Sequence, residues 1–204
     1  LVTELGVKRL ILCSRRGAET EDAALTVAEL EQLGAEVRVV AADAADRSQL
    51  ASIFAEEPNL RGVVHAAGLL EDGVIASQSP EQMSRVLRPK VDGAYHLHEL
   101  SLTQPLDLFV MISSIAGVLG APGQTNYAAA NSFLDALAGH RRALGLTAVS
   151  LGFGPWANSG VSGDLAAADL VRMERRGVGV LSPDDALSAL GAVLSERIPS
   201  SLAV

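Results

Sequence analysis

The chain has 204 residues, which is enough for one domain with a sizeable hydrophobic core. Its hydrophobic content of 49% and charged content of 20% are ordinary for a soluble globular protein. The net charge of -8, with no compensating basic run, argues against a nucleic-acid-binding surface, and no apolar run approaches the roughly 18–20 residues that span a bilayer.

Short apolar runs alternate with helix-like segments along the chain. The opening "LVTELG" is typical of the last turns of a helix that stops at Gly6. Continuous Val, Ile and Leu runs, without in-and-out alternation, indicate strands of a parallel sheet that is covered on both faces. The runs predict strands over 9–14, 36–42, 61–67, 106–114 and 147–153, with a weaker candidate in the final "SSLAV".

Helix signals lie between these strands. One helix is expected over 20–33, and an Ala-rich one runs from 125 to about 144. Alternating strands and helices predict an α/β fold: a Rossmann-like, doubly wound parallel sheet with helices on both faces, as one domain over 1–204. The candidate cap and stop residues are Gly34, Asp46, Ser79, Gly145 and Ser182.

The pattern is incomplete at the ends and irregular near the C-terminus. A doubly wound nucleotide-binding domain has a strand and a glycine-rich turn before its first helix, yet no G-x-G-x-x-G occurs in the chain. Both ends look cut, so we expect the first strand and the glycine-rich loop to be lacking. Gly and Ser flank a short helical piece within 158–180, which we expect to be a mobile lid over the substrate.

Cysteine usage indicates a reducing compartment. Cys13 is the only cysteine, so it cannot form an internal disulfide, and nothing at the N-terminus resembles a signal peptide. The expected location is the cytoplasm, with no membrane, nucleic acid or metal among the expected partners.

The stretch "SSIAGVLGAPGQTNYAAAN" (113–131) holds a candidate proton donor. Tyr127 begins an Ala-rich run thirteen residues after Ser114, so its phenol could pass a proton to a carbonyl oxygen. A phenol has an unperturbed pKa near 10, and proton exchange at neutral pH needs a nearby cation. The position one helical turn on holds Asn131 instead. Taken alone, a Ser-Ser turn is most often a plain loop, and a tyrosine on such a helix most often packs.

These residues, extended to "GHRRALG", resemble the ketoreductase domain of modular polyketide synthases, a branch of the short-chain dehydrogenase/reductase superfamily. The motifs "SRRG", "HAAG", "LRPKVDGAYHLHEL" and "SPDDALSAL" carry the same resemblance, in order and with family-like spacing, over 1–204. The resemblance implies the catalytic half of such a domain, without its first strand and glycine loop and without the separate N-terminal structural subdomain.

The resemblance implies a catalytic set of Ser114, Tyr127, Lys90 and Asn131. In most of the superfamily a lysine stands four residues after the tyrosine, whereas in the polyketide branch the lysine and asparagine exchange places. Asn131 holds the later site here, and the lysine falls in "LRPKVDG" as Lys90. The other lysine, Lys8, precedes a strand at the end expected to lie away from the site.

The resemblance also implies NADPH as the cofactor. An acid after the second strand of such a fold would bind the ribose hydroxyl of NAD, whereas "SRRG" offers arginines for the 2′-phosphate of NADP. Two exposed arginines can equally be only a solvated turn. In the family an Asp-Ala pair lies against the adenine of the cofactor. The "HAAG" motif lies below the nicotinamide, and its histidine is a packing residue. The "GPW" motif lies at the carboxamide end of the nicotinamide. The implied cofactor residues are Ser14, Arg15, Arg16, Asp43, Ala44, His65, Ala66, Ala67, Gly68, Gly154, Pro155 and Trp156.

The family divides by the face on which hydride is delivered. One class carries "LDD", with Pro and Asn before the tyrosine; the other carries a tryptophan eight residues before it. With "LED" and with Leu119 at the tryptophan position, this chain resembles the B-type class, which gives the D-configured 3-hydroxyl. Ala129 stands where epimerising members tend to have proline, although "EDG" can equally be a surface turn. The implied substrate-guiding residues are Leu70, Glu71, Asp72, Pro122 and Asn126.

The implied function is NADPH-dependent reduction of a 3-oxoacyl thioester on an acyl carrier protein to a D-3-hydroxyacyl thioester during polyketide chain extension. The implied partners are the carrier protein with its phosphopantetheinyl arm, the structural subdomain and other synthase domains. Two alternatives stay open: a stand-alone short-chain reductase, and a non-catalytic nucleotide-binding scaffold within a larger synthase.

Overall fold

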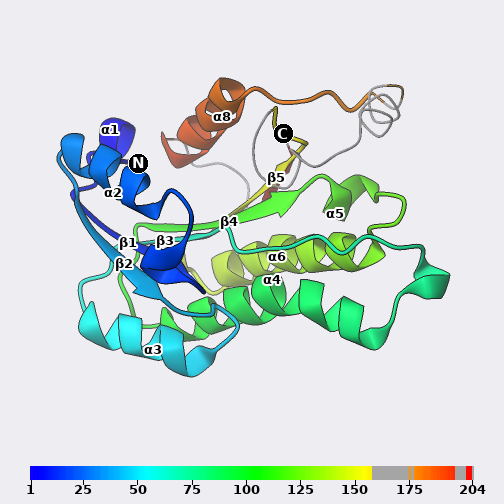
Figure 1. The fold of residues 1–204 in the computed structure, drawn as a ribbon, viewed down its shortest axis with the longest axis horizontal. Coiled ribbons are helices and arrows are strands. Elements are labelled where there is room, and N and C mark those ends of the chain that lie inside the picture. The colour runs from blue at the N-terminus through cyan, green and yellow to red at the C-terminus, as the bar shows by residue number, and fades with distance from the viewer. Residues whose placement is uncertain (158–174, 176, 196–200, 204) are drawn as a thin grey trace.

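The computed structural model describes residues 1–157, 175, 177–195 and 201–203. Parallel strands form the centre of this part of the chain, and helices cover both of their faces, so the predicted fold class is confirmed (Figure 1). The strands are β1 (Arg9–Ser14), β2 (Glu36–Ala41), β3 (Gly62–His65), β4 (Leu108–Ser114), β5 (Val149–Phe153) and β6 (Ser201–Ala203), each paired in parallel.

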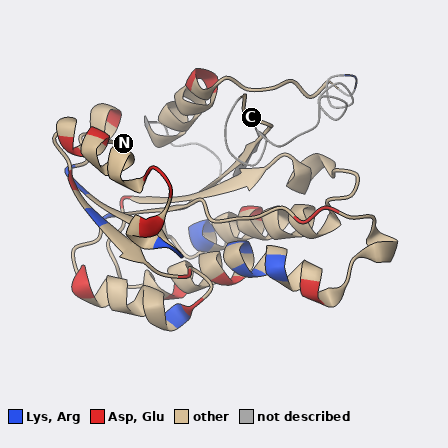
Figure 2. Ribbon diagram, in the orientation of Figure 1, with Lys and Arg blue, Asp and Glu red and all other residues tan. Residues whose placement is uncertain are grey.

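The helices form two layers (Figure 1). One face of the strands carries α1 (Val2–Leu5), α2 (Ala23–Gln32) and α8 (Pro183–Ser195). The other carries α3 (Arg47–Glu56), α4 (Pro80–Leu100) and α6 (Thr125–Ala143), while the short α5 (Ala116–Leu119) directly follows β4. Among the described residues, no helix combines the length and the hydrophobicity that crossing a membrane requires. Basic and acidic residues are interspersed along α4 (Figure 2).

The strands pair as two sheets in the described residues. β1 pairs with β2, and the other sheet has the order β3-β4-β5-β6. In the part of the chain that the structure describes, β1 and β3 each have a strand on one side only. A doubly wound sheet has the order 3-2-1-4-5-6, so its first strand lies between the second and the fourth. The break between β1 and β3 therefore falls where the expected missing strand would lie.

Local signals set most element ends as the sequence predicts. Asp46 caps α3 by accepting from Ser48 N and Gln49 N, and Ser79 and Gln82 form a capping box at the start of α4. Gly34 follows α2 with a φ of +87°, which a residue with a Cβ rarely adopts. The largest differences are at α2, which begins at Ala23 because residues 17–22 form a 3₁₀ helix and a turn, and at β3, which ends at His65. Strands β2, β4 and β5 are one or two residues shorter than predicted.

The main core lies between the larger sheet and α3, α4 and α6. Alternation along β4 directs Phe109 and Met111 into this core, while Val110 faces the layer that contains α8. Helices α4 and α6 pack against each other beneath β4 (Figure 1). This packing brings residues that are far apart in sequence together near the carboxyl end of β4.

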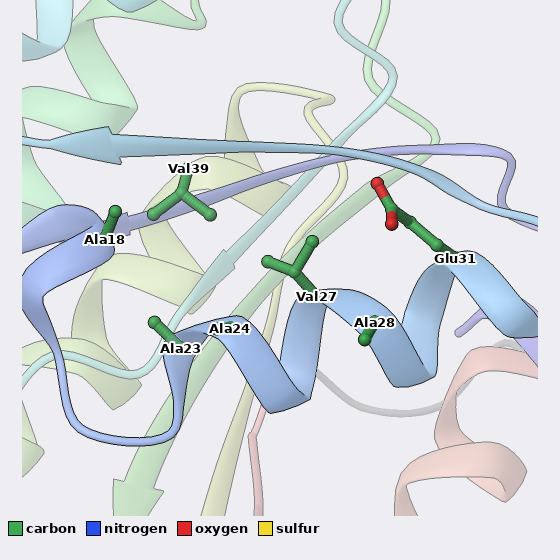
Figure 3. A pocket seen from close by; sticks show the side chains of 7 residues that line it. All are labelled: Ala18, Ala23, Ala24, Val27, Ala28, Glu31 and Val39. Atoms are coloured by element: carbon green, nitrogen blue, oxygen red, sulfur yellow. The ribbon is translucent and has the colours of Figure 1, made fainter.

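Helix α2 packs loosely by comparison, because none of its residues is fully buried. A hollow of about 350 Å³ lies between α2 and β2 (Figure 3). It is lined by Ala18, Ala23, Ala24, Val27, Ala28, Glu31 and Val39. Nearly all of these side chains are small and apolar, and none belongs to the predicted catalytic or cofactor set.

Candidate active site

Lys90 lies in the middle of α4 with its ammonium inside the protein. The residue is 4% exposed, and Nζ donates a hydrogen bond of 2.8 Å to the main-chain oxygen of Ile112 in β4. Burial lowers the pKa of Lys90 to about 8, and the charge of Asp135 opposes the shift. The lysine is therefore mostly protonated at neutral pH but can lose its proton under mildly basic conditions.

Tyr127 stands in the first turn of α6, next to this ammonium. Lys90 Nζ is 5.6 Å from the centroid of the Tyr127 ring. Burial raises the pKa of Tyr127, and the charge of Asp72 acts in the same direction, whereas hydrogen bonds with Asn131 and Ser114 oppose the rise. The structure thus brings together the phenol and the cation that the sequence places 37 residues apart.

The two serines at the end of β4 lie in different surroundings. Ser114 Oγ accepts from Ala116 N at 3.2 Å and also takes part in the hydrogen bonding of the Tyr127 phenol. Ser113 is buried, and its Oγ donates to the main-chain oxygen of Asn131 at 3.3 Å. Ser114 is thus the serine beside the phenol, while Ser113 ties β4 to α6.

Asn131 and Asp135 continue the helix face that begins with Tyr127. Asn131 Nδ2 donates to the main-chain oxygen of Tyr127 at 2.8 Å, while its buried Oδ1 has no hydrogen-bond partner among the described residues. Such acceptors are rare in folded proteins, so Oδ1 marks a place for a donor from water or ligand. Asp135, which accepts from Ser150 at 2.6 Å, was missed at the sequence level. Asp135 stands four residues after Asn131, a spacing that places both side chains on the same face of the helix, and this spacing could have indicated that Asp135 lies near the site.

The residues after β3 pack against the lysine. His65 is buried with Nε2 3.3 Å from the main-chain oxygen of Lys90, and burial, followed by the charge of Lys90, lowers the pKa of His65 to about 4. His65 is therefore neutral at pH 7 and can donate to the helix backbone. A Cβ at Gly68 would lie 2.9 Å from Lys90 Cε, so glycine leaves the space that the lysine side chain uses. Ala66 and Ala67 connect these two contacts.

Two arginines follow β1 at the carboxyl end of the strand. Arg15 and Arg16 are exposed, and neither forms an ion pair with a described residue. Ser14, just before them, shares a hydrogen bond of 2.9 Å with the Thr20 hydroxyl. A pair of guanidinium groups without carboxylate partners suits a phosphate, because guanidinium donors match phosphate oxygens.

Asp43 and Ala44 follow the neighbouring strand β2. Asp43 Oδ1 accepts from Ala45 N at 2.9 Å, so its carboxylate shapes the turn. Ala44 Cβ lies 3.2 Å from the place that a Cβ of Gly93 would occupy, which brings this turn against α4. The residues present thus fit the phosphate-bearing adenosine end of NADPH, whereas the sequence holds no glycine-rich motif for the pyrophosphate.

Gly154, Pro155 and Trp156 follow β5 and are joined to the segment before α8. Leu181 N donates to the main-chain oxygen of Pro155 at 2.8 Å, and Trp156 forms an isolated parallel bridge with Leu181. The Trp156 ring stands edge-on to Phe153, with centroids 5.2 Å apart. The predicted carboxamide-contacting segment therefore lies at the carboxyl end of β5, held by packing.

The predicted substrate-guiding residues come from two loops that contact each other. Gly73 N donates to the main-chain oxygen of Gly123 at 2.8 Å, and Asn126 Nδ2 donates to the main-chain oxygen of Glu71 at 2.9 Å. Leu70 is half-buried, and Asp72 and Pro122 are exposed. Sequence reasoning missed Arg85 and Gln124, whose side chains bind Glu71 and Asp72. No local pattern links either pair.

The predicted lid over 158–180 falls outside the described residues, except for 175 and 177–180. Within the described ranges, no group of three or more His, Cys, Asp or Glu side chains could hold a metal ion.

Comparison with known proteins gives matches over nearly the whole chain. The family model described as "KR domain" matches residues 1–158. A "Mycoketide-CoA synthase" from Mycobacterium tuberculosis is 54% identical over 191 residues, which are 92% of this chain and 5% of that protein. A "Putative inactive phenolphthiocerol synthesis polyketide synthase type I Pks1" from the same organism is 46% identical over 208 residues, which are 100% of this chain and 13% of that protein.

A solved structure agrees with these matches. "Structure of A-type Ketoreductases from Modular Polyketide Synthase" superposes with a TM-score of 0.90 at 46% identity, covering 96% of this chain and 42% of that chain. The chain thus spans less than half of that structure and a small part of the curated relatives.

Proposed function

The chain belongs to the KR family, the ketoreductase domains of modular type I polyketide synthases, and on this premise we propose that it reduces a 3-oxoacyl thioester on an acyl carrier protein to a D-3-hydroxyacyl thioester with NADPH. The observation that carries the proposal is the buried ammonium of Lys90, 5.6 Å from the Tyr127 ring. Packing does not require a desolvated cation beside a phenol, whereas ketone reduction with a tyrosine as the general acid uses that cation to stabilise the tyrosinate.

Reduction of a ketone needs a hydride at carbon and a proton at oxygen. NADPH, when bound, supplies the hydride. Tyr127 donates its phenolic proton to the substrate oxygen as general acid. Ser114 donates a hydrogen bond to the same oxygen and stabilises the negative charge that develops there.

Lys90 and Asn131 make the phenol usable at neutral pH. Burial raises the pKa of Tyr127, so the phenol is protonated before the reaction, and the tyrosinate left afterwards needs stabilisation. Bringing a phenol pKa from about 10 to about 7 requires roughly 4 kcal/mol. A close ammonium in a site with little water supplies energy of that order. The free Oδ1 of Asn131 can hold Lys90 or a water through which the proton is replaced.

The chain's own residues support NADPH over NADH. Arg15 and Arg16 would hold the 2′-phosphate, and residues 15–18, directly after β1, include no acid that would bind a free ribose hydroxyl. His65 to Gly68 would lie below the nicotinamide, with His65 neutral and without an acid-base role.

Support for the D-configured product comes from the two loops beside Tyr127. Asp72 and Asn126 match the B-type pattern, and Leu119 stands where the other class has tryptophan. Asp72 lies close enough to the phenol to raise its pKa, so this loop borders the space next to the reacting carbonyl. The solved ketoreductase at 46% identity is titled A-type, so the overall likeness does not support the B-type class, and the proposal depends on these particular residues alone.

The alternatives make different predictions. A scaffold that only binds nucleotide would have no need for the complete set of Ser114, Tyr127, Lys90 and Asn131, although one relative is named inactive. A stand-alone short-chain reductase would act on free thioesters without preference for carrier-bound substrate.

The test uses the full-length polypeptide that carries these residues. With a 3-oxoacyl thioester of pantetheine, Tyr127→Phe should lower NADPH consumption by about 10²–10⁴-fold, the usual contribution of a general acid. Tyr95→Phe is the matched control, because Tyr95 is the other tyrosine and is exposed on α4. Full turnover by Tyr127→Phe would refute the mechanism, and chiral analysis of the wild-type product tests the configuration.

A further inference from the structure

The loop that precedes Gly73 has no regular secondary structure of its own. Residues 66–74 form neither helix nor strand, so their position depends on contacts with neighbouring elements. On one side the loop binds the segment before Tyr127: Gln124 Nε2 donates to Asp72 Oδ2 at 2.9 Å, and Asn126 Nδ2 donates to the main-chain oxygen of Glu71 at 2.9 Å.

On its other side the loop is bound to α4 through the Glu71 carboxylate, chiefly by Arg85 and also by Gln82. Arg85 donates to both carboxylate oxygens of Glu71, from Nε at 2.9 Å and from Nη2 at 2.6 Å. This two-pronged geometry is the strongest arrangement available to an arginine and a carboxylate. It also lowers the pKa of Glu71, so the carboxylate is ionised at neutral pH.

Asn126 and Arg85, which both bind Glu71, belong to the two helices that carry the catalytic residues. Asn126 is fully buried, and its Oδ1 accepts from Tyr127 N at 2.8 Å, so one side chain joins the loop to the catalytic tyrosine's backbone. Arg85 lies on α4 five residues before Lys90. The loop is therefore held between the helix that carries the lysine and the helix that carries the tyrosine.

We infer that Arg85 is a positioning residue for product configuration: its forked ion pair with Glu71 holds the 70–73 loop, and with it Leu70 and Asp72, in the place that selects the face of the carbonyl. This inference rests on the proposed D-selective reduction. An isolated exposed ion pair contributes little to global stability. A small energy suffices here because the loop forms no helix or strand, so a few side-chain and main-chain contacts fix its position, and the Arg85–Glu71 pair is the main one to α4.

The experiment measures product configuration in the full-length polypeptide with the same pantetheine thioester. Arg85→Gln removes the guanidinium fork, and the ratio of D to L product should fall roughly two- to fivefold, the upper part of the range that an exposed ion pair supplies. Arg88→Gln is the matched control, because Arg88 is an exposed arginine on the same helix that pairs with Asp92 at 3.8 Å. Its product ratio should be that of the wild type.

A charge-swapped double variant separates positioning from a general loss of structure. Glu71→Arg alone should lower the D to L ratio as Arg85→Gln does, and adding Arg85→Glu should recover most of it. An unchanged ratio in Arg85→Gln, or no recovery in the double variant, would overturn the inference. A wild-type product of L configuration, or no reduction at all, would instead refute the proposed function, so the two failures are distinguishable.

Discussion

Lys90 places a positive charge where packing alone would favour an apolar side chain. Its pKa of about 8 means that the folded protein holds a desolvated ammonium at pH 7, whereas the unfolded chain exposes it to water. Between pH 8 and the ordinary lysine value near 10.4, the unfolded chain binds a proton that the folded chain has lost. This group's contribution to stability therefore rises with pH in that window. The proposed activity thus requires a group that destabilises the fold at neutral pH.

Replacing this lysine should separate stability from activity. Lys90→Met keeps the stem but removes the charge, so we expect reductase activity to be lost while the free energy of unfolding at pH 7 rises by about 1–3 kcal/mol. Urea unfolding monitored by circular dichroism measures the change. Lys8→Met is the control, since Lys8 is the other lysine and is exposed. A less stable Lys90→Met protein would contradict this account of the ammonium.

A substitution at Gly68 tests the position of the Lys90 side chain without changing the lysine itself. A methyl group there would lie 2.9 Å from Lys90 Cε and 3.5 Å from Nζ, so Gly68→Ala must displace the lysine side chain. We expect kcat to fall at least tenfold, because displacement of a catalytic group by an ångström has effects of about that size or larger. Gly62→Ala in β3 is the control: its Cβ would meet Leu108 at an ordinary 3.5 Å. Equal kcat values for the two variants would show that the lysine tolerates the shift.

Helices α4 and α6 are also joined by a buried polar cluster around Arg141. Arg141 is 1% exposed, and its Nη1 donates to His98 Nδ1 at 3.1 Å and to Ser101 Oγ at 2.9 Å. Its guanidinium carbon lies 3.7 Å from the centroid of the Phe109 ring, and burial lowers the pKa of Arg141 to about 10. Because His98 Nδ1 accepts this hydrogen bond, the imidazole is neutral. Protonating it would place two cations together.

The cluster predicts sensitivity to acid. Burial, then the charges of Arg141 and His140, lower the pKa of His98, while Glu99 opposes the shift and the Tyr95 ring packs beside it. An unfolded histidine takes up a proton near pH 6.5, so stability should fall as pH drops through that value.

Replacing the imidazole by a neutral acceptor tests this reading. His98→Gln should lose less stability than the wild type between pH 7 and pH 5, as thermal unfolding at both values measures. The variant should still lose the part of the stability that depends on neutral His65, because the lowered pKa of His65 also makes the fold less stable as the pH falls. His96→Gln on the same helix is the control, because it replaces an imidazole outside the hydrogen bonds of Arg141. An identical loss of stability in His98→Gln and wild type would contradict the role of His98.

Elements were predictable from sequence where their signals are local. The cap at Ser79, the stop at Gly34 and the apolar runs each act within a few residues, so the helices and strands follow from them. Contacts between distant elements could not be predicted in this way, because no local sequence pattern relates the two partners. Arg85 and Glu71 are 14 residues apart, and Arg141 and His98 are 43 residues apart. The Lys90 assignment came from the family resemblance, because its position beside Tyr127 depends on how α4 packs against α6.

The break in the sheet separates two groups of residues that the proposed reaction needs together. β1 and β2 carry the arginines and Asp43, whereas β3, β4 and α6 lead to the catalytic set. The two parts meet through α3 and α4, where Arg47 pairs with Glu99 at 3.3 Å and Ala44 packs at Gly93. In the described residues no strand pairs with both β1 and β3, so main-chain hydrogen bonds do not fix their spacing.

NADPH would have to bridge this break, so its affinity should depend on what fills it. We expect residues 1–204 alone to bind NADPH weakly, and a polypeptide extended before Leu1 by a strand and a glycine-rich loop to bind at least tenfold tighter. A new strand would pair with both open edges and position the two groups, and the loop would supply main-chain donors for the pyrophosphate. Titration calorimetry of both polypeptides measures the difference. In the longer one, replacing Arg15 and Arg16 by glutamine should weaken NADPH more than NADH, because only NADPH carries the 2′-phosphate. Equal, tight binding by both polypeptides would show that the open edges of β1 and β3 do not limit the cofactor site.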